Sequence, residues 1–542
     1  MKKRVLLCTE SSRFATGYGV YGRELLKRLN EKYDIAELAC YVTQDDQKVK
    51  NTPWKVYANK PHENDPEFQN YLMSSSFEYG EFIFNNVLLD FRPHYVLDFR
   101  DPWAFEYQSR SPFRDYFNWI ISPTIDARPQ NAEWMELYGQ ADGVITYSDF
   151  GMQAILDQCP DIKTCGVASP AASDAFHPFD IEMKKSLRAS NGIPEEVYIL
   201  GTVMRNQPRK LFPELFKLFK RFLQTTGRQD VYLYCHTAFP DVGWNIPELL
   251  IDNDISSRVL FTYKCVKCNN VSVSHFSDTI KVCDKCGNYT KNIAGIGNSL
   301  TEDELNYVYN IFDAYIQYAT NEGFGIPIVE ASKAGVPVMN VNYSSMEDFP
   351  KKLGTFGIDV LTFTKESSTS RLLAVPDENS ALDILSDLFS MEREKLHVMG
   401  QDFRNLNIKT YSWDKNADVW INAIESTPVK SKQWNAPPEI MQPYPFVDGF
   451  QTPEQQAEFL ICGVLQKPEF MYKHTWRRLI KDLTYRTTAN NAGGILYFNE
   501  EAYKDNIKNK PFSFNDAYQS MCQLREYYNK WEINRHESNV HR

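Results

Sequence analysis

Two stretches of this chain alternate short apolar runs with amphipathic runs, and this alternation constrains the fold more than any other feature. In the first stretch, Arg4–Cys8 has the composition of a buried strand, and Val20–Asn30 places its leucines at helical spacing. In the second, the strand-like runs Tyr198–Val203 and Val231–His236 enclose the helix-like run Leu211–Leu223. Such alternation predicts βαβ units, in which helices cover both faces of a parallel sheet.

At 542 residues the chain is too long for one core. A linker is predicted where Pro178 and the Asn-Gly-Ile-Pro sequence at 191–194 interrupt the alternation. We therefore expect an α/β protein with two Rossmann-like domains, residues 1–190 and 191–410, facing across a cleft. A short crossover helix at 411–430 and an aromatic-rich C-terminal module at 431–542 follow. Other expected elements are strands at Tyr95–Phe99, Asn118–Ile121, Gly143–Thr146 and Arg258–Tyr263, and a capped helix at Thr301–Asn310.

Charge and cysteine content limit the cellular compartment and the binding partners that we expect for this protein. The net charge of −11 gives no general attraction to nucleic acids or anionic membranes. No apolar run is long enough to span a bilayer, and the run at Val5–Cys8 is too short for a signal peptide. Eleven cysteines without a secretion signal predict a reducing, cytoplasmic location, where clustered cysteines bind metal rather than form disulfides.

Four of these cysteines have the spacing of a zinc ribbon. Cys265, Cys268, Cys283 and Cys286 form C-x2-C-x14-C-x2-C. Four thiolates close a tetrahedral site and leave no open coordination position, so the expected zinc is structural. Two disulfides or an iron–sulfur cluster are the alternatives. The ribbon, at 264–292, is predicted to be inserted into the second domain.

A glycine-rich turn in the second domain carries two carboxylates eight residues apart. The segment runs from Asn321 through Glu322, Gly323, Phe324, Gly325, Ile326 and Pro327 to Glu330. Glycines let backbone approach a ligand closely, and the helix that follows presents unpaired N–H groups and a positive dipole. Such a helix start suits an anion, for example a diphosphate.

Two further segments have chemistry that suits a diphosphate. The first is literally G-x-G-x-x-G, with Gly17, Gly19 and Gly22, but a polar loop separates Gly17 from the strand that ends at Cys8. That gap disfavours nicotinamide binding, because the dinucleotide fingerprint begins almost directly after its strand. The second segment is 204–210, where Arg205, Arg209 and Lys210 follow a predicted strand as a phosphate clamp.

In this order and spacing the three segments resemble those of the family 4 retaining glycosyltransferases, over about residues 1–425. The resemblance implies a glycosyltransferase-B fold and a nucleotide-diphosphate sugar as donor, without a catalytic metal. Gly17 and Gly19 would lie over the donor diphosphate, and Gly323, Phe324, Gly325 and Ile326 would bind the donor through the turn and helix start. Arg205 and Lys210 would neutralise the leaving group, with Arg209 able to replace Lys210. Glu322 would hold sugar hydroxyls and Glu330 the ribose.

One position departs from this family pattern. Many members carry a histidine after a strand of the first domain, and this sequence has Asp126 there. Asp126 would either accept the acceptor's proton or fix a sugar hydroxyl. Asp101, which follows the previous predicted strand, is a second candidate; a helix cap or loop hydrogen bond is the alternative role for both aspartates.

The predicted activity is retaining transfer of a sugar to an acceptor hydroxyl. The acceptor is either a glycan, lipid or protein, or a hydroxylated base in DNA, as modified by some virus-encoded enzymes of this general type. The DNA hypothesis rests on the basic ribbon and on the basic-to-neutral C-terminal segment of an otherwise acidic chain, although zinc ribbons are more often scaffolds. Its lysines are Lys264, Lys267, Lys281, Lys285 and Lys291. A zinc-ribbon nucleic-acid-binding protein with inactive transferase domains is the alternative function.

Overall fold

The computed structural model describes residues 2–434, except 112, 278, 368 and 433. These residues belong to one compact unit, which ends at Trp434. The predicted C-terminal module at 431–542 lies outside the described residues from 435 onward. Of the described helices, none combines the length and the apolar character needed to cross a membrane.

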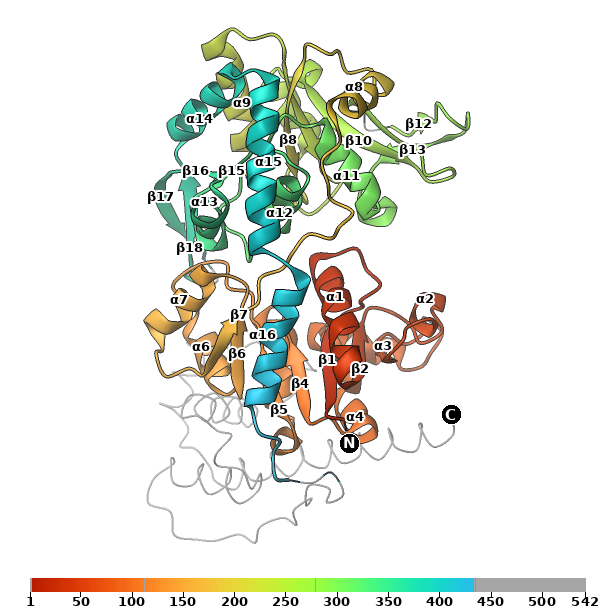
Figure 1. Ribbon diagram of the computed structural model, residues 1–542. Coiled ribbons are helices and arrows are strands. Elements are labelled where there is room, and N and C mark those ends of the chain that lie inside the picture. Colours follow the sequence, from red (N-terminus) through yellow and green to blue (C-terminus); the bar gives the residue numbers. More distant parts are fainter. Residues whose placement is uncertain (1, 112, 278, 368, 433, 435–542) are drawn as a thin grey trace, which may run out of the picture. The chain divides into compact units, whose positions relative to one another are not determined.

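The first half is a doubly wound α/β domain (Figure 1). Its seven strands are all parallel and lie in the order β3-β2-β1-β4-β5-β6-β7. The strands are β1 (Arg4–Glu10), β2 (Asp34–Cys40), β3 (Lys55–Ala58), β4 (Tyr95–Asp98), β5 (Asn118–Ile121), β6 (Gly143–Thr146) and β7 (Thr164–Val167). The helices are α1 (Gly17–Lys32), α2 (Gln47–Lys50), α3 (Phe68–Tyr71), α4 (Phe82–Phe91), α5 (Pro102–Ser109), α6 (Ala132–Gly139) and α7 (Asp149–Gln158). Strands β4, β5 and β6 are buried at every residue, because helices cover both faces of the sheet.

The second half repeats this strand order in a second sheet. Its parallel core runs β10-β9-β8-β14-β15-β16. The strands are β8 (Tyr198–Val203), β9 (Val231–His236), β10 (Val259–Cys265), β14 (Ala314–Gln317), β15 (Val338–Val341) and β16 (Phe356–Ile358), with a separate hairpin of β17 (Val360–Lys365) and β18 (Leu372–Pro376). The helices are α8 (Ile181–Ser190), α9 (Phe212–Thr226), α10 (Ile246–Asp252), α11 (Glu302–Ile311), α12 (Ile326–Lys333), α13 (Asp348–Leu353), α14 (Glu378–Ser390) and α15 (Arg393–Thr410). Two doubly wound sheets confirm the predicted fold class.

The cysteine-containing insertion extends the second sheet. β10 pairs with parallel β9 and continues into antiparallel pairing with β11 (Val271–His275) and β13 (Tyr289–Ile293). β12 (Lys281–Val282) then pairs with β13. The insertion is therefore attached to the domain through a shared strand, and Cys265 is the last residue of that strand.

The last described helix, α16 (Trp413–Ser426), packs against α1 of the first half (Figure 1). Trp420 Nε1 donates to the hydroxyl of Tyr21 at 2.8 Å, and Asn416 donates to the same hydroxyl at 2.9 Å. Arg28 on α1 pairs with Asp414 at 2.6 Å. The chain thus returns from the second half to the first through α15 and α16.

Candidate functional site

The predicted site residues follow the strands at the centre of each sheet, where the strand order reverses. In the first sheet the loop after β1 leads to Gly17, and the loop after β4 leads to Asp101. In the second sheet Lys210 follows β8 and Glu322 follows β14. Ligands of doubly wound sheets bind at this switch point, outside the carboxyl ends of the strands.

The glycine segment of the first half forms the start of α1 and reaches the second half. Thr16 caps the helix by accepting from Gly19 N at 3.1 Å. A Cβ atom at Gly17 would lie 3.5 Å from Cδ1 of Ile326, the first residue of α12. The two segments predicted to enclose a diphosphate are therefore neighbours.

The turn before α12 contains two glycines for different physical reasons. Gly325 caps α12 in the left-handed region, with φ of 104°, where other residues are strained. At Gly323 the reason is space, because a Cβ atom would lie 2.3 Å from Cγ2 of Thr124 in the first half. Ser345 Oγ donates to the carbonyls of Glu322 and Phe324 at 2.6 and 3.0 Å and holds the turn in place.

Glu322 is the centre of a buried ion cluster. Its Oε2 accepts from Arg209 Nη1 at 2.6 Å, whereas Oε1 accepts from Lys210 Nζ and from Gln317 Nε2. The side chains of Lys210 and Glu322 are each only 7% exposed. Because each carboxylate oxygen has two lone pairs, Oε2 can still accept one hydrogen bond from a ligand.

Arg205 lies outside this cluster. Its guanidinium pairs with Asp241 at 3.0 Å, and its side chain is 47% exposed. The structure therefore brings Arg209 and Lys210, rather than Arg205 and Lys210, to Glu322. Two adjacent residues can both reach Glu322 because the backbone of Lys210 forms an antiparallel β-bridge with Ala319. This bridge fixes the loop after β8 against the segment that follows β14.

Glu330 lies in the second turn of α12, apart from the Glu322 cluster. Its Oε2 accepts from the hydroxyl of Tyr309 on α11 at 2.7 Å. Burial raises the pKa of Glu330 to about 7, and the Tyr309 hydrogen bond opposes this shift. Glu330 is therefore poised between its neutral and charged forms at neutral pH.

Asp126 and Asp101 approach the cluster from the first half. Asp126 accepts from Asn321 Nδ2 at 2.8 Å and also from Arg371 Nη1. Asp101 occupies the N-cap position of α5 but makes no capping hydrogen bond with its side chain. Burial and the neighbouring charge of Asp126 raise the pKa of Asp101 to about 6, and the nearby Arg209 opposes the shift. Two coupled carboxyl groups thus face the cations of the second half.

Sequence analysis did not identify Arg371, Asn321 or Gln317 as members of this site. Arg371 precedes β18 and pairs with Glu366 at 2.8 Å as well as with Asp126. No motif marks it, since its partner Asp126 is 245 positions away. Asn321 begins the glycine turn that was recognised, so its position before Glu322 was the available signal. Gln317 ends β14, a strand that was not predicted.

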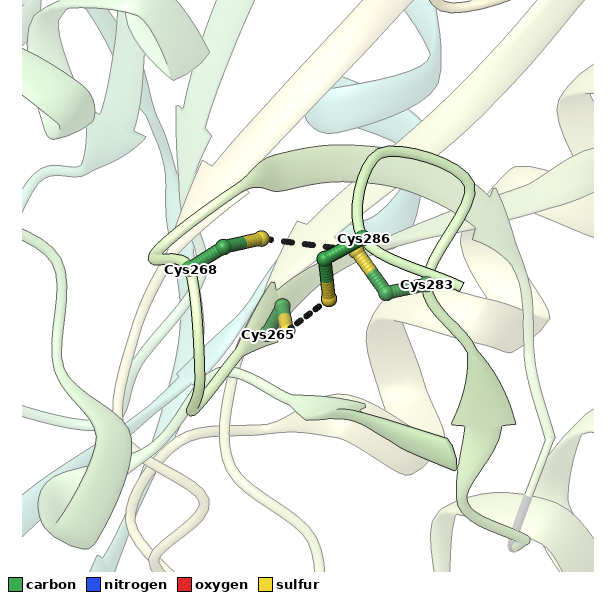
Figure 2. A group of neighbouring side chains, drawn as sticks. All are labelled: Cys265, Cys268, Cys283 and Cys286. Carbon is green, nitrogen blue, oxygen red and sulfur yellow. Dashed lines mark hydrogen bonds between the residues drawn. The ribbon is translucent and has the colours of Figure 1, made fainter. Parts of the chain in front are cut away.

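The four cysteines form a cluster with the dimensions of a zinc site (Figure 2). The Sγ atoms of Cys265 and Cys286 are 3.7 Å apart, and those of Cys268 and Cys283 are 3.6 Å apart. A tetrahedral Zn²⁺ with Zn–S bonds of about 2.3 Å requires sulfur atoms about 3.8 Å apart. All four thiols are free, and these separations exclude disulfides in this arrangement. The residues present therefore fit a tetrahedral metal ion.

The two cysteine turns repeat one backbone device. Asn269 N donates to the carbonyl of Cys265 at 2.9 Å, and Gly287 N donates to that of Cys283 at 2.8 Å. Asn269 and Gly287 both have positive φ, of 57° and 68°. Asparagine and glycine tolerate this conformation best, so the sequence after each cysteine pair favours the turn.

The ribbon is less basic at its surface than its sequence suggests. Lys264 pairs with Glu304 at 2.8 Å, and Lys291 pairs with Asp284 at 2.8 Å. Their side chains are only 8% and 6% exposed. Lys291 thus holds two parts of the ribbon together and Lys264 joins the ribbon to α11, and neither is available to an external anion.

Solved structures share this fold. A sucrose-phosphate synthase from Thermosynechococcus elongatus matches 78% of this chain and 98% of its own, with a TM-score of 0.56 at 13% identity. HepE from Anabaena, in complex with UDP and glucose, matches 79% and 100%, with a TM-score of 0.54 at 12% identity. The chain has the glycosyltransferase-B fold. A glycosyltransferase from Rickettsia africae matches 78% and 99%, with a TM-score of 0.52 at 12% identity. No protein-family model and no curated protein sequence matches the chain.

Proposed function

We propose that this protein is a retaining glycosyltransferase that uses a nucleotide-diphosphate sugar. The observation that carries the proposal is that Gly17 approaches Ile326 at the start of α12, after the turn in which Glu322 pairs with the adjacent cations Arg209 and Lys210, at the switch points of the two sheets. The Anabaena structure of the same fold contains UDP and glucose, which supports a nucleotide sugar as the donor class.

The donor's diphosphate would take the place of Glu322 as the partner of Arg209 and Lys210. Arg209 is 38% exposed and can turn toward a ligand, whereas Lys210 is buried beside Glu322. Burial and the charge of Arg209 lower the pKa of Lys210, and an anionic ligand would favour its charged form. The start of α12 adds N–H groups and a helix dipole of the same sign. Glu330, farther along α12, would accept hydrogen bonds from ribose hydroxyls, and its ionised form makes the stronger hydrogen bonds.

In the chemical step, charge develops on the leaving diphosphate while the sugar acquires oxocarbenium character. Arg209, Lys210 and the α12 helix start would stabilise the first charge through preorganised electrostatics. Asp101 and Asp126 would face the acceptor molecule. A carboxyl group with a pKa of about 6, such as Asp101, is suited to accept the acceptor's proton near neutral pH.

Zinc in the ribbon would have a structural role. Four cysteines saturate a tetrahedral site and leave no position for substrate. When bound, the ion holds the two cysteine turns together. Because two lysines of the ribbon are engaged in buried ion pairs, one within the ribbon and one with Glu304 of α11, we propose that it is a scaffold attached to β10 rather than a nucleic-acid platform.

The proposal is tested by incubating the full chain with a panel of sugar nucleotides and measuring nucleoside diphosphate release. Candidate acceptors are added in parallel, namely glycans, lipids, proteins and DNA with hydroxylated bases, and their masses are compared before and after. NMR of the product's anomeric proton then separates retention from inversion. Release that depends on one donor and on Lys210, with retained configuration, is the expected result.

An exposed lysine of the same half provides a control variant. Lys217→Met removes a side chain that is 69% exposed and pairs at the surface with Glu378, so it should leave transfer unchanged. Lys210→Met should abolish transfer. Absence of turnover with every donor, together with tight and salt-sensitive DNA binding, would instead establish the nucleic-acid-binding alternative.

A further inference from the structure

A cavity of about 450 Å³ lies in the second half, at the amino ends of strands β14 and β15. It is lined by α8, by the start of α15, and by Asp313 and Pro337, which directly precede β14 and β15. Glu322 follows the other end of β14. The cavity is thus separated from the donor site by the four-residue length of β14, about 13 Å.

The inner wall of the cavity is rigid and positively charged. Arg188 and Arg393 both pair with one carboxylate, that of Asp313, at 2.7 and 3.0 Å. Backbone carbonyls hold the same guanidinium groups, for example Ile311 O with Arg188 at 2.6 Å and Val197 O with Arg393 at 2.8 Å. Two fixed guanidinium groups therefore share a single negative charge, which is the arrangement of a preorganised anion site.

Lys184 on α8 adds a third cation to this wall. Its ammonium group makes no hydrogen bond or ion pair with any of the described residues, whereas its neighbour Lys185 pairs with Glu195 at 3.1 Å. Desolvation lowers the pKa of Lys184 to about 8; the charge of Asp313 opposes this shift and that of Arg188 adds to it. Desolvation and then the charge of Lys184 lower the pKa of His397 on α15. A partly buried cation without a partner raises the free energy of the empty site, and an anion would relieve it.

Apart from Asp313, the carboxylates that line the cavity lie at its rim. Glu182 and Glu195 are 86% and 70% exposed and Glu394 is also exposed, in contrast to Asp313 at 3%. Phe312, Pro337 and Leu396 supply an apolar wall. The interior thus combines three cations, one carboxylate and apolar side chains, a lining that suits a phosphate group with or without a small organic body.

We propose that this cavity is a second binding site, for phosphate or a small phosphorylated molecule, and that it is independent of the donor site. Lys184, Arg188 and Arg393 hold the phosphate group. The ligand bridges α8 and α15, which flank the amino ends of β14 and β15. Neither the sugar donor nor its acceptor is needed for this binding.

Site-resolved acetylation of lysines tests the proposal on the full chain. The protein is treated with an amine-selective acetylating reagent at pH 8, with inorganic phosphate, phenyl phosphate or sodium chloride at equal ionic strength, and modification is read by peptide mass spectrometry. Either phosphate compound should slow acetylation of Lys184 at least about fivefold, as occupancy excludes the reagent. Lys217 on α9, which is 69% exposed and does not line the cavity, is the internal control and should not respond. If phenyl phosphate protects Lys184 at lower concentrations than inorganic phosphate does, the site prefers a phosphorylated organic ligand. If both protect at the same concentration, the ligand is free phosphate.

A variant provides a second readout. Calorimetric titration with phosphate in excess UDP, which occupies any anion site at Glu322, should give about tenfold weaker binding for Lys184→Met and unchanged binding for Lys217→Met. No protection of Lys184, or equal protection of Lys184 and Lys217, would overturn the proposal. Equal phosphate affinity of Lys184→Met and the natural chain would do the same.

Discussion

Replacing Glu322 by alanine should destabilise the protein strongly even without substrate. The substitution removes the carboxylate that accepts from Lys210, Arg209 and Gln317. Arg209 is 38% exposed and can be solvated, but Lys210 is only 7% exposed and cannot. The effect is therefore that of leaving one buried charge without its partner.

The magnitude follows from that burial. Removing one partner of a buried ion pair costs about 3–5 kcal/mol. With a urea dependence of about 3 kcal/mol per molar, the first unfolding transition should shift by about 1 M or more. The double substitution Glu322→Ala and Lys210→Met should recover most of the loss, because it removes the unpaired charge as well.

Glu378 offers a matched control, since it is also a glutamate with two cationic partners. It pairs with Lys217 at 3.2 Å and with Arg221 at 3.0 Å, and these side chains are 69% and 42% exposed. Exposed pairs contribute about 0–1 kcal/mol, so Glu378→Ala should change the urea midpoint little.

Circular dichroism during urea titration measures these stabilities, and metal analysis of the same samples should show unchanged zinc in Glu322→Ala. Transfer should be lost in that variant and in its double mutant, because both lack the carboxylate. The reasoning is refuted if Glu322→Ala unfolds at the same urea concentration as the natural chain. It is equally refuted if Lys210→Met adds to the damage of Glu322→Ala instead of reversing it.

Three further predictions concern other parts of the molecule. Purified protein should contain one zinc per chain, and Cys283→Ser or a strong chelator should remove it and lower the melting temperature, because the ion joins both cysteine turns. Gly323→Ala should destabilise by about 1–3 kcal/mol, since its Cβ would lie 2.3 Å from Cγ2 of Thr124, and Thr124→Ser should restore stability by removing that methyl group. Glu330→Gln should be more stable than the natural chain at pH 8 by about 2 kcal/mol, because the folded-state pKa of about 7 exceeds the unfolded value. The natural chain should lose this stability as pH rises from about 4.5 through 7.

Each of these has a contradicting result. Iron or no metal in the purified protein would exclude the structural zinc. Failure of Thr124→Ser to improve Gly323→Ala would place the strain elsewhere than at that methyl group. A difference in stability between Glu330→Gln and the natural chain that does not change between pH 5 and pH 8 would show that Glu330 does not titrate in this range.

The sequence predicted much of the fold, because strand and helix periodicities are local properties. β5, β6, β8 and β9 have the predicted bounds, and α11 carries the capping box expected at Thr301. The cysteine cluster was predictable for the same reason, since each pair of ligands lies within one turn. The glycines of the turn before α12 were predicted from their place in the motif. The reason that Gly323 cannot carry a side chain lies in Thr124 of the other half.

Which cations meet Glu322 was decided only in three dimensions. Along the chain we predicted Arg205 and Lys210 as the clamp, with Arg209 only as a substitute for Lys210. The bridge between Lys210 and Ala319 instead turns Arg209 toward Glu322, while Arg205 meets Asp241. Arg371 joins Asp126 across 245 positions, a contact that no local pattern contains.

By itself, then, the sequence determined two doubly wound sheets, the segments at their switch points and the four cysteine ligands. Each of these follows from periodicity or spacing within a short window of chain. The tertiary structure decided the partners of each charge, the pKa values of Asp101 and Glu330, and the removal of Lys264 and Lys291 from the ribbon surface. The physical reason is that burial and Coulomb interactions depend on what surrounds a side chain, and those surroundings come from distant parts of the chain.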